Sequence, residues 1–173
     1  MEAEQPQHWT SHKAACRSAS KPAATASGTT PFKINGEPIR QMDGNTFMSN
    51  LTSPLANLSK PETYRRLIDS YRFRKEDEYT QSGDASGLYG GEDPLPDFLD
   101  FMRQAVRRKV VPDWWTKADM KAISTFADGE DEWANINHAV EKSDIQEHYD
   151  NPMMPMSLRI LAEKALGSSA RGF

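Results

Sequence analysis

Residues 59–79, SKPETYRRLIDSYRFRKEDEY, carry the pattern that decides the fold. Ser59 is a favoured helix N-cap residue, and Pro61 falls in the first turn, where its missing N–H costs no hydrogen bond. Apolar side chains then recur at helical spacing, at Tyr64, Leu67, Ile68 and Tyr71. The pattern predicts an amphipathic helix that ends near Tyr79. The charged residues of its opposite face are Arg65, Arg66, Lys75 and Glu76.

Two more helices are predicted after this one. Asp93 is expected to cap the first, with Pro94 at its first position, and Pro112 to end it. Its expected buried stripe is Leu95, Phe98, Leu99, Met102 and Val106. Residues 116–119 resemble a capping box with Asp in place of the usual Glu, and they open a second helix that Gly129 ends. The apolar face of that helix comprises Met120, Ile123, Phe126 and Ala127.

The C-terminal part predicts shorter helices. The spacing of apolar residues indicates one or two short helices, with Ser143 as the cap between them; these residues are Trp133, Ile136, Val140 and Ile145. Asn151-Pro152 predicts a turn, and residues 157–166 a last helix with Gly167 at its C-cap. The inward side chains of that helix are expected to be Leu158, Leu161 and Leu166. The fold class is therefore mainly α, with a compact helical domain over 59–167.

The residues before this domain have a different character. Residues 17–31, RSASKPAATASGTTP, have linker composition, and burial cannot repay the entropy of ordering such a segment. Residues 32–58 predict an irregular strap, in which Asn35-Gly36 indicates a small hairpin with a type I′ turn. We therefore expect a disordered N-terminal arm ahead of the domain and a short tail over 168–173.

Charge and hydropathy argue against several function classes. The chain of 173 residues carries a formal net charge of −4, which opposes general affinity for nucleic acid. The basic run Arg107, Arg108 and Lys109 falls at the end of a predicted helix, so we favour a solvated helix terminus over a phosphate site. No apolar run is long enough to predict a membrane span.

The same composition bears on the compartment. The N-terminus lacks the apolar core of a secretory signal, and a single cysteine excludes an internal disulfide. We therefore expect an intracellular protein, cytoplasmic or nuclear, with no membrane partner.

The N-terminal stretch EQPQHWTSHKAAC, residues 4–16, contains a possible pair of metal ligands. His12 and Cys16 stand one helical turn apart, a spacing at which both side chains can share a tetrahedral zinc ion. With Trp9 and Lys13 in register, the stretch resembles the last helix of a MYND-type zinc finger, C-Q-x-x-H-W-x-x-H-K-x-x-C. The resemblance implies that His12 and Cys16 are one ligand pair of such a finger. The alternative is a chance H-x-x-x-C on a disordered arm.

The stretch also departs from that family. An intact MYND finger holds two zinc ions with seven cysteines and one histidine, whereas Glu4 stands where this pattern requires a cysteine, and Cys16 is the chain's single cysteine. Metal binding supplies the folding free energy of such small domains. We therefore expect residues 1–16 to be the C-terminal remnant of a truncated finger that binds no zinc by itself.

The helical domain points to the same family. GLYGGEDPLPDF (residues 87–98), the step at residues 112–115, and AVEKSDIQEHY (residues 139–149) followed by MPMSLR (residues 154–159) resemble the region after the finger in fungal MYND-finger proteins. The resemblance implies a non-enzymatic interaction or scaffold protein, whose intact finger docks short proline-rich peptides. It implies a protein or peptide partner and no small-molecule substrate.

Three groups of residues are candidates for a site in the helical domain. Trp114, Trp115 and Trp133 are our candidates for partner binding, with closure of the core as the alternative. One helix face would carry Asp144, Glu147 and His148, near Glu141, for metal or acid–base chemistry, although a solvated charged face is favoured. His138 is expected to be structural. Residues 87–91, GLYGG, lack the Lys and Ser/Thr of a phosphate loop and predict a plain turn.

Two other function classes remain as alternatives. A lysine methyltransferase related to the MYND proteins would need SET-domain cofactor and tyrosine motifs, which this sequence lacks. A transcriptional regulator that binds nucleic acid would need a basic face, which the acidic net charge opposes. The interaction protein is therefore the favoured hypothesis.

Overall fold

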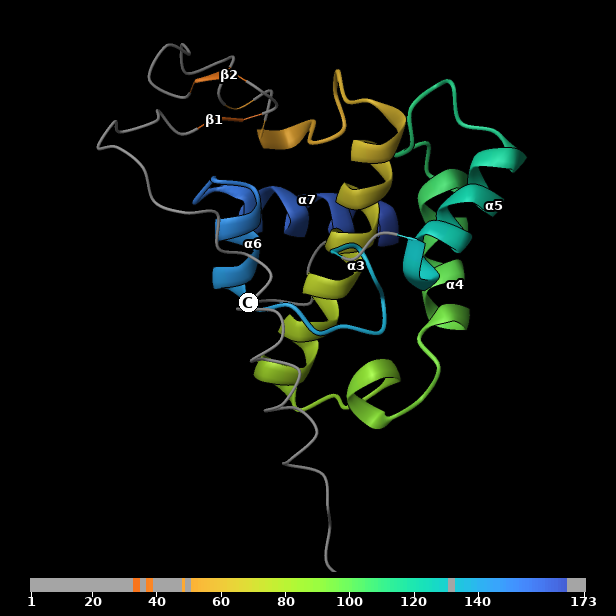
Figure 1. Ribbon diagram of the computed structural model, residues 1–173, viewed down its shortest axis with the longest axis vertical. Coiled ribbons are helices and arrows are strands. Elements are labelled where there is room, and N and C mark those ends of the chain that lie inside the picture. Colours follow the sequence, from red (N-terminus) through yellow and green to blue (C-terminus); the bar gives the residue numbers. More distant parts are fainter. Residues whose placement is uncertain (1–32, 35–36, 39–47, 49–50, 131–132, 168–173) are drawn as a thin grey trace, which may run out of the picture. The chain divides into compact units, whose positions relative to one another are not determined.

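The computed structural model describes residues 33–34, 37–38, 48, 51–130 and 133–167 (Figure 1). The chain divides into two units, Met1–Thr30 and Pro31–Phe173, and every described residue belongs to the second. The predicted finger remnant, the linker over 17–31 and the tail over 168–173 lie outside the described residues. The prediction of a mainly α fold with a compact helical domain is confirmed.

A two-residue ladder stands where the hairpin is predicted. Strand β1 (Lys33–Ile34) pairs with β2 (Glu37–Pro38) in antiparallel register, with Lys33 opposite Pro38 and Ile34 opposite Glu37. Pro38 is tolerated because each strand of a two-stranded sheet is an edge strand. The Asn35-Gly36 turn lies outside the described residues.

The central helix α3 (Lys60–Ser82) is the one that the sequence predicts, three residues longer at its C-terminus. The Ser59 side chain accepts a hydrogen bond from the Glu62 backbone N–H, so the predicted cap is confirmed. Gly83 ends the helix at φ 69°, and its N–H donates to the Tyr79 carbonyl at 3.0 Å. Glycine adopts this left-handed conformation without steric cost, which explains the stop.

The predicted charged face of α3 is wrong at Arg66, which is 6% exposed. The apolar face is buried as expected, but so are polar side chains around the rest of the helix: Thr63, Asp69, Ser70, Arg72 and Asp77. α3 packs against α7 and α4, and further contacts come from the segment after Trp133. A helix with neighbours on several sides buries residues on most of its circumference. The spacing of its apolar residues alone therefore predicts fewer buried side chains than the structure shows.

Helix α4 (Leu95–Arg107) follows a short 3₁₀ turn, η2 (Gly87–Gly90). The N-cap is Pro94, one residue later than predicted, although Asp93 Oδ1 accepts a hydrogen bond from the Leu95 N–H at 2.9 Å. The predicted stripe is partly wrong, because Val106 is 39% exposed and Leu95 and Leu99 are half-buried. The buried stripe is Phe98, Phe101, Met102 and Ala105.

Lys109, rather than Pro112, ends α4. Its φ is 57°, its N–H donates to the Val106 carbonyl at 3.0 Å, and the Val110 N–H donates to the Ala105 carbonyl at 2.9 Å. These two bonds form a Schellman motif, in which glycine is the usual left-handed residue. A lysine there accepts a steric cost that glycine avoids.

Helix α5 (Lys117–Thr125) opens with the predicted capping box. The Thr116 side chain accepts from the Asp119 N–H, and Asp119 Oδ2 accepts from the Thr116 N–H at 2.8 Å. A π-helical turn, η3 (Phe126–Glu130), follows and contains Gly129 at φ 126°. Ile123 and Ala127 are buried and Met120 and Phe126 half-buried, so the predicted apolar face is confirmed.

The region after Trp133 corrects two predictions. Residues 133–141 form bends and turns rather than a helix, although Ala134, Ile136 and Val140 are buried. Helix α6 (Lys142–His148) is capped at Glu141, whose N–H donates to Asp144 Oδ2 at 2.8 Å, and not at Ser143.

Helix α7 (Met154–Leu166) begins three residues before the predicted start. Asn151 Oδ1 accepts from the Met153 N–H at 2.9 Å, and Pro155 lies in the first turn. Leu158 and Leu161 are buried as expected, Leu166 is half-buried, and Gly167 at φ 63° ends the helix. The predicted C-cap is therefore confirmed.

Helix α7 joins the other helices of the domain. It crosses α3 in Figure 1 and packs against α3, α4 and α6. One buried cluster gathers side chains from α3, α4, α5 and α7, and a smaller one comprises Phe73, Val140, Ile145, Met154 and Leu158. Within the described residues, no helix combines the length and the apolar character that crossing a membrane requires.

Candidate functional site

An open groove of about 900 Å³ lies in the described part of the chain. One wall is the strap, residues 52–58, and the other is the α4–α5 connection, residues 108–110 and 112–114. Leu161 and Lys164 of α7 complete the lining. We call this hollow the strap groove. Figure 1 shows the strap and the connection at the same upper end of α3.

The N-terminal half of the strap is held to the helical domain. Leu51 is 2% exposed, Pro54 is buried, and Leu55 packs against the main core cluster. The Lys164 ammonium group of α7 donates a hydrogen bond to the Thr52 carbonyl. These contacts place residues 52–58 over the domain and leave a groove beside them.

The opposite wall is positioned by a buried carboxylate. Asp119 is 3% exposed and accepts hydrogen bonds from Lys60 Nζ at 2.7 Å, Tyr64 OH at 2.8 Å and Thr116 Oγ1 at 2.6 Å. The hydrogen bond from Lys60, followed by those from Thr116, holds the pKa of Asp119 well below its usual range. Since Lys60 and Tyr64 belong to α3, this cluster ties the start of α5 to the start of α3.

Tyr64 shares in this cluster. Burial, followed by the hydrogen bond to Asp119, raises the pKa of Tyr64 to about 12. The phenol therefore stays protonated and continues to donate to the carboxylate throughout the neutral range.

Two of the predicted partner-binding tryptophans lie in the α4–α5 connection. Trp114 lines the strap groove and is half-buried, with Lys60 Nζ 4.8 Å from its ring centroid. Trp115 turns toward the core, where its ring edge meets Tyr64 at a centroid distance of 5.6 Å. Within the described part of the chain, the buried Trp115 Nε1 has no hydrogen-bond partner. Both indole rings pack against the main core cluster, and of the two only Trp114 also lines the groove.

The third predicted tryptophan belongs to a different environment. Trp133 Nε1 donates to Asp69 Oδ2 at 2.8 Å, and its ring stacks on His148 with centroids 3.9 Å apart. Asp69 is fully buried and also accepts from Arg72 Nη1 at 2.8 Å and Tyr149 OH at 2.6 Å. We call this set the Asp69 cluster. The structure does not bring Trp133 to the groove.

The Asp69 cluster is a fully paired buried ion pair. Arg72 is 5% exposed and also donates to the Trp133 carbonyl at 2.8 Å and the His138 carbonyl at 3.0 Å. Burial, followed by the charge of Asp69, raises the pKa of Tyr149 well above its ordinary value. Each charge therefore has several partners, as a buried pair must. The cluster links α3 to the segments that flank α6.

The acidic candidates on α6 do not converge. Asp144 caps the Glu141 backbone, Glu147 is exposed, and His148 is engaged with Trp133 and the edge of Tyr149. The described residues contain no group of three or more His, Cys, Asp and Glu side chains that could hold a metal. His12 and Cys16 lie outside those residues, so the zinc half-site stays a prediction.

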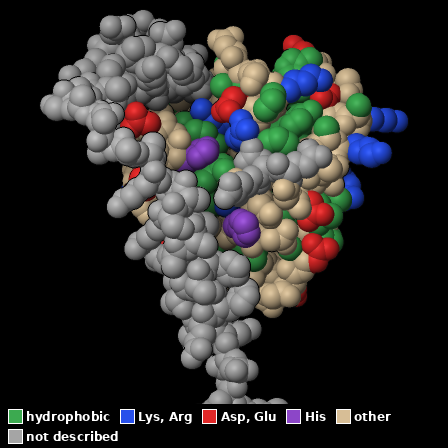
Figure 2. Space-filling model, viewed as in Figure 1, with side chains coloured by type: hydrophobic (Ala, Val, Ile, Leu, Met, Phe, Trp, Pro, Cys, Tyr) green, Lys and Arg blue, Asp and Glu red, His purple; other side chains and the backbone are tan. Residues whose placement is uncertain are grey.

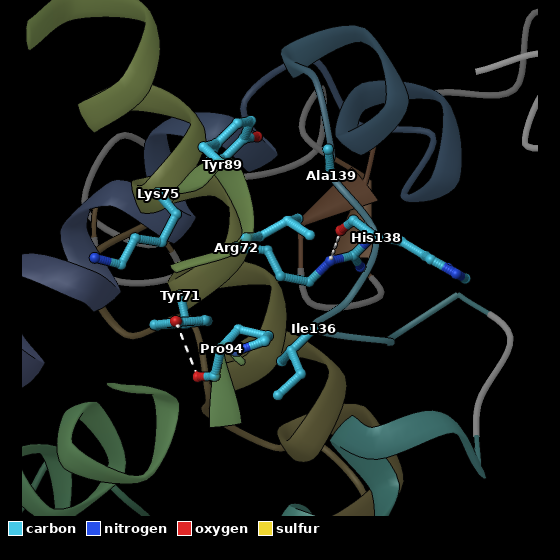
Figure 3. Close-up of a pocket in the computed structure, with 9 residues that line it drawn as sticks. Tyr71, Arg72, Lys75, Tyr89, Pro94, Ile136, His138 and Ala139 are labelled. Atoms are coloured by element: carbon cyan, nitrogen blue, oxygen red, sulfur yellow. Dashed lines mark hydrogen bonds between the residues drawn. The ribbon is translucent and has the colours of Figure 1, made fainter. Parts of the chain in front are cut away.

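A second cavity, near the glycine-rich turn, is too small for a ligand. Its volume of about 10 Å³ suits one water molecule at most. Figure 3 shows Tyr71 donating to the Pro94 carbonyl and Arg72 to the His138 carbonyl in its lining. The Gly87 N–H donates to Glu92 Oε2, and the Glu92 N–H donates to the Gly87 carbonyl. Both donors are therefore already hydrogen-bonded within the turn.

Sequence reasoning found one wall of the strap groove and missed the other features. The strap residues carry no motif, and Lys164 stands more than fifty residues beyond Arg108. A detectable signal was the break at residues 110–116, where two tryptophans follow a proline between helices. Asp69 gave no signal, because a carboxylate on a helix is ordinarily exposed.

Comparison with known proteins adds no assignment. No protein-family model, no curated protein and no solved structure matches this chain. The functional argument therefore depends on the geometry of the strap groove and on the sequence.

Proposed function

We propose that this chain is a non-enzymatic protein-interaction module, and that a linear peptide segment of a partner protein binds in the strap groove. The observation that carries the proposal is the groove itself, lined by a half-buried tryptophan and open to solvent. Its volume is within the range of ligand sites, about 300–1,000 Å³. Aromatic anchors such as Trp114 supply much of the affinity in peptide and protein interfaces.

The shape of the groove favours a peptide over a compact metabolite. The lining comes from two separate segments, residues 52–58 and residues 108–110 and 112–114, so the groove is long and open on one side. Binding along such walls suits an extended chain, which offers backbone donors and acceptors at regular spacing. The resemblance of residues 4–16 to a MYND finger supports the same class, because that family docks peptides. We assign the module to the cytoplasm or nucleus on the basis of its composition.

Selection from a random peptide library tests the proposal. Peptides of about twelve residues, long enough to span both walls, are enriched on the full chain and then synthesised. Their affinities are measured for the wild type and for Trp114→Ala. Truncation of a central aromatic anchor is expected to weaken binding about 30-fold.

The matched control is Met156→Ala. Met156 is 48% exposed on α7 and does not line the groove, so its truncation should leave affinity unchanged. Thermal unfolding of both variants confirms that they are folded. No enrichment, or enriched peptides that bind Trp114→Ala as tightly as wild type, would refute the proposal.

A further inference from the structure

The strap groove carries a charge opposite to that of the whole chain. Arg108, Lys109 and Lys164 line it, together with a single carboxylate, Asp113. The chain as a whole has a formal net charge of −4. In the space-filling view, Lys and Arg side chains also project at the right edge of the molecule, near α5 and outside the groove (Figure 2). The groove is therefore a local basic site on an acidic protein.

These three cations are not neutralised by the domain. Among the described residues, no carboxylate forms an ion pair with Arg108, Lys109 or Lys164. On α3, by contrast, most basic residues pair with carboxylates, among them Arg72, Arg74 and Lys75. Positive charge at the groove is therefore not offset by an ion pair among the described residues.

Two of the cations also have structural contacts with neutral groups. Lys164 donates a hydrogen bond to the Thr52 carbonyl. The Arg108 guanidinium lies against Gly167 at the end of α7, so close that a Cβ added to this glycine would be 1.8 Å from Arg108 Nη1. Carbonyl groups orient a cation without cancelling its charge. Lys109 is exposed.

Backbone geometry singles out the same place. The described non-glycine residues with positive φ are Asn57 at 59°, Lys109 at 57° and Asp150 at 45°, and the first two line the groove. A lysine in the left-handed position of a Schellman motif costs stability that glycine would not. Residues kept in such conformations cluster at functional sites. Lys109 thus supplies a charge at the groove rim where glycine would be the more stable choice.

We propose that the partner segment bound in the strap groove is acidic, an extended peptide rich in Asp and Glu with at least one apolar side chain. Its carboxylates pair with Lys109, Arg108 and Lys164, and its apolar side chain packs on Trp114. Opposite charges across the interface accelerate association and select the partner. This inference rests on the proposed function and names the chemistry of its ligand.

The test uses three fluorescein-labelled pools of peptides of about twelve residues. All pools carry random apolar residues at alternate positions. The positions between them hold Asp/Glu in the acidic pool, Lys/Arg in the basic pool and Ser/Asn in the neutral pool. Affinities for the full chain are measured by fluorescence anisotropy at low and at physiological salt. We expect the acidic pool to bind most tightly and to weaken as salt is added.

The charge variant is Arg108→Gln/Lys109→Glu. The control, Lys117→Glu/Lys121→Gln, makes the same charge change at exposed positions of α5 outside the groove. We expect the groove variant to lose about tenfold in affinity for the acidic pool. We expect the control to lose less than about twofold, because distant exposed charges are screened. Thermal unfolding establishes that both variants are folded.

The outcomes separate this inference from the proposed function. Neutral or basic peptides that bind best, and whose binding needs Trp114, would overturn the acidic partner and leave the peptide groove intact. If no pool binds, both proposals fail. A single-stranded oligonucleotide of equal charge that displaces the acidic peptides at equal concentration would overturn the choice of a peptide carboxylate as the ligand.

Discussion

Trp114 and Trp133 are the same residue type, predicted for the same role, and the structure gives them opposite environments. Trp133 donates its indole N–H to a fully buried aspartate and stacks on His148. Trp114 lies half-buried on the wall of an open groove, beside Lys60. Tryptophan has an apolar body and one polar donor, and its function depends on what receives that donor.

The comparison separates a structural cluster from the proposed binding surface. The Asp69 cluster uses each polar group within the domain, and truncating one member leaves a buried charge unpaired. The strap groove keeps cations without carboxylate partners, and changing them should affect binding more than folding. Four stability predictions test whether the two regions differ in this way.

The largest effect is expected for Asp69→Ala. This change leaves Arg72 buried without its carboxylate, so we expect the free energy of unfolding to fall by about 3–5 kcal/mol. Urea unfolding of the full chain, followed by circular dichroism, measures the loss. Asp113→Ala in the groove is the control, with an expected change below about 0.5 kcal/mol. Equal effects of the two changes would contradict the distinction between the regions.

The second prediction compares Trp133→Phe with Trp114→Phe. The first removes a hydrogen bond to a buried carboxylate and should cost about 1.5–3 kcal/mol of stability. The second retains an aromatic ring at a half-exposed site and should cost less than about 1 kcal/mol. Urea unfolding of both variants measures the two losses of stability. A costlier Trp114→Phe would mean that the groove wall is part of the core.

The third prediction concerns acid and the Asp119 cluster. The pKa of Asp119 is lowered in the folded state, chiefly by Lys60, so its contribution is complete above the unfolded value of about 3.9. That contribution is lost as the pH falls below this value toward the lower folded pKa. Asp119→Asn should therefore flatten the acid limb of the stability profile.

At neutral pH, Asp119→Asn should also cost about 1–2 kcal/mol, because the capping box at α5 is weakened. The measurement is the midpoint of urea unfolding at several pH values between neutral and acid. An acid limb unchanged in the variant would show that other carboxylates account for it. Asp100→Asn, at an exposed position on α4, serves as the control.

The smallest effect has the opposite sign. Lys109→Gly relieves the left-handed conformation of a non-glycine residue and should stabilise the domain by about 0.5–1 kcal/mol. The same change should weaken binding of acidic peptides. Thermal unfolding and anisotropy on one preparation measure both. A variant that gains stability and keeps full affinity would remove Lys109 from the binding surface.

Much of the helical pattern follows from local sequence. Ser59 and Thr116 cap their helices because a side-chain oxygen reaches a backbone N–H three residues away. Gly167 ends α7 because it adopts positive φ without strain. These interactions involve few residues, so they can be recognised in a single sequence.

The exceptions were set by contacts between distant segments. Residues 133–141 have helical spacing of apolar side chains, yet Arg72 binds the carbonyl groups of Trp133 and His138 and the segment stays irregular. Ser143 was chosen as a cap by type, whereas the capping pair is Glu141 and Asp144. Val106 is exposed, whereas Phe101 and Ala105 are buried in the core cluster that α4 shares with α7.

The sequence by itself determined the helices, their caps and the mainly α class, because short-range hydrogen bonds and periodic apolar residues specify them. Tertiary structure alone decided that Asp69 is a buried hub, that Trp133 is structural, and that Trp114 faces a groove. The strap, the α4–α5 connection and α7 lie far apart along the chain and meet through packing. Packing depends on how whole helices fit together, which no local pattern encodes.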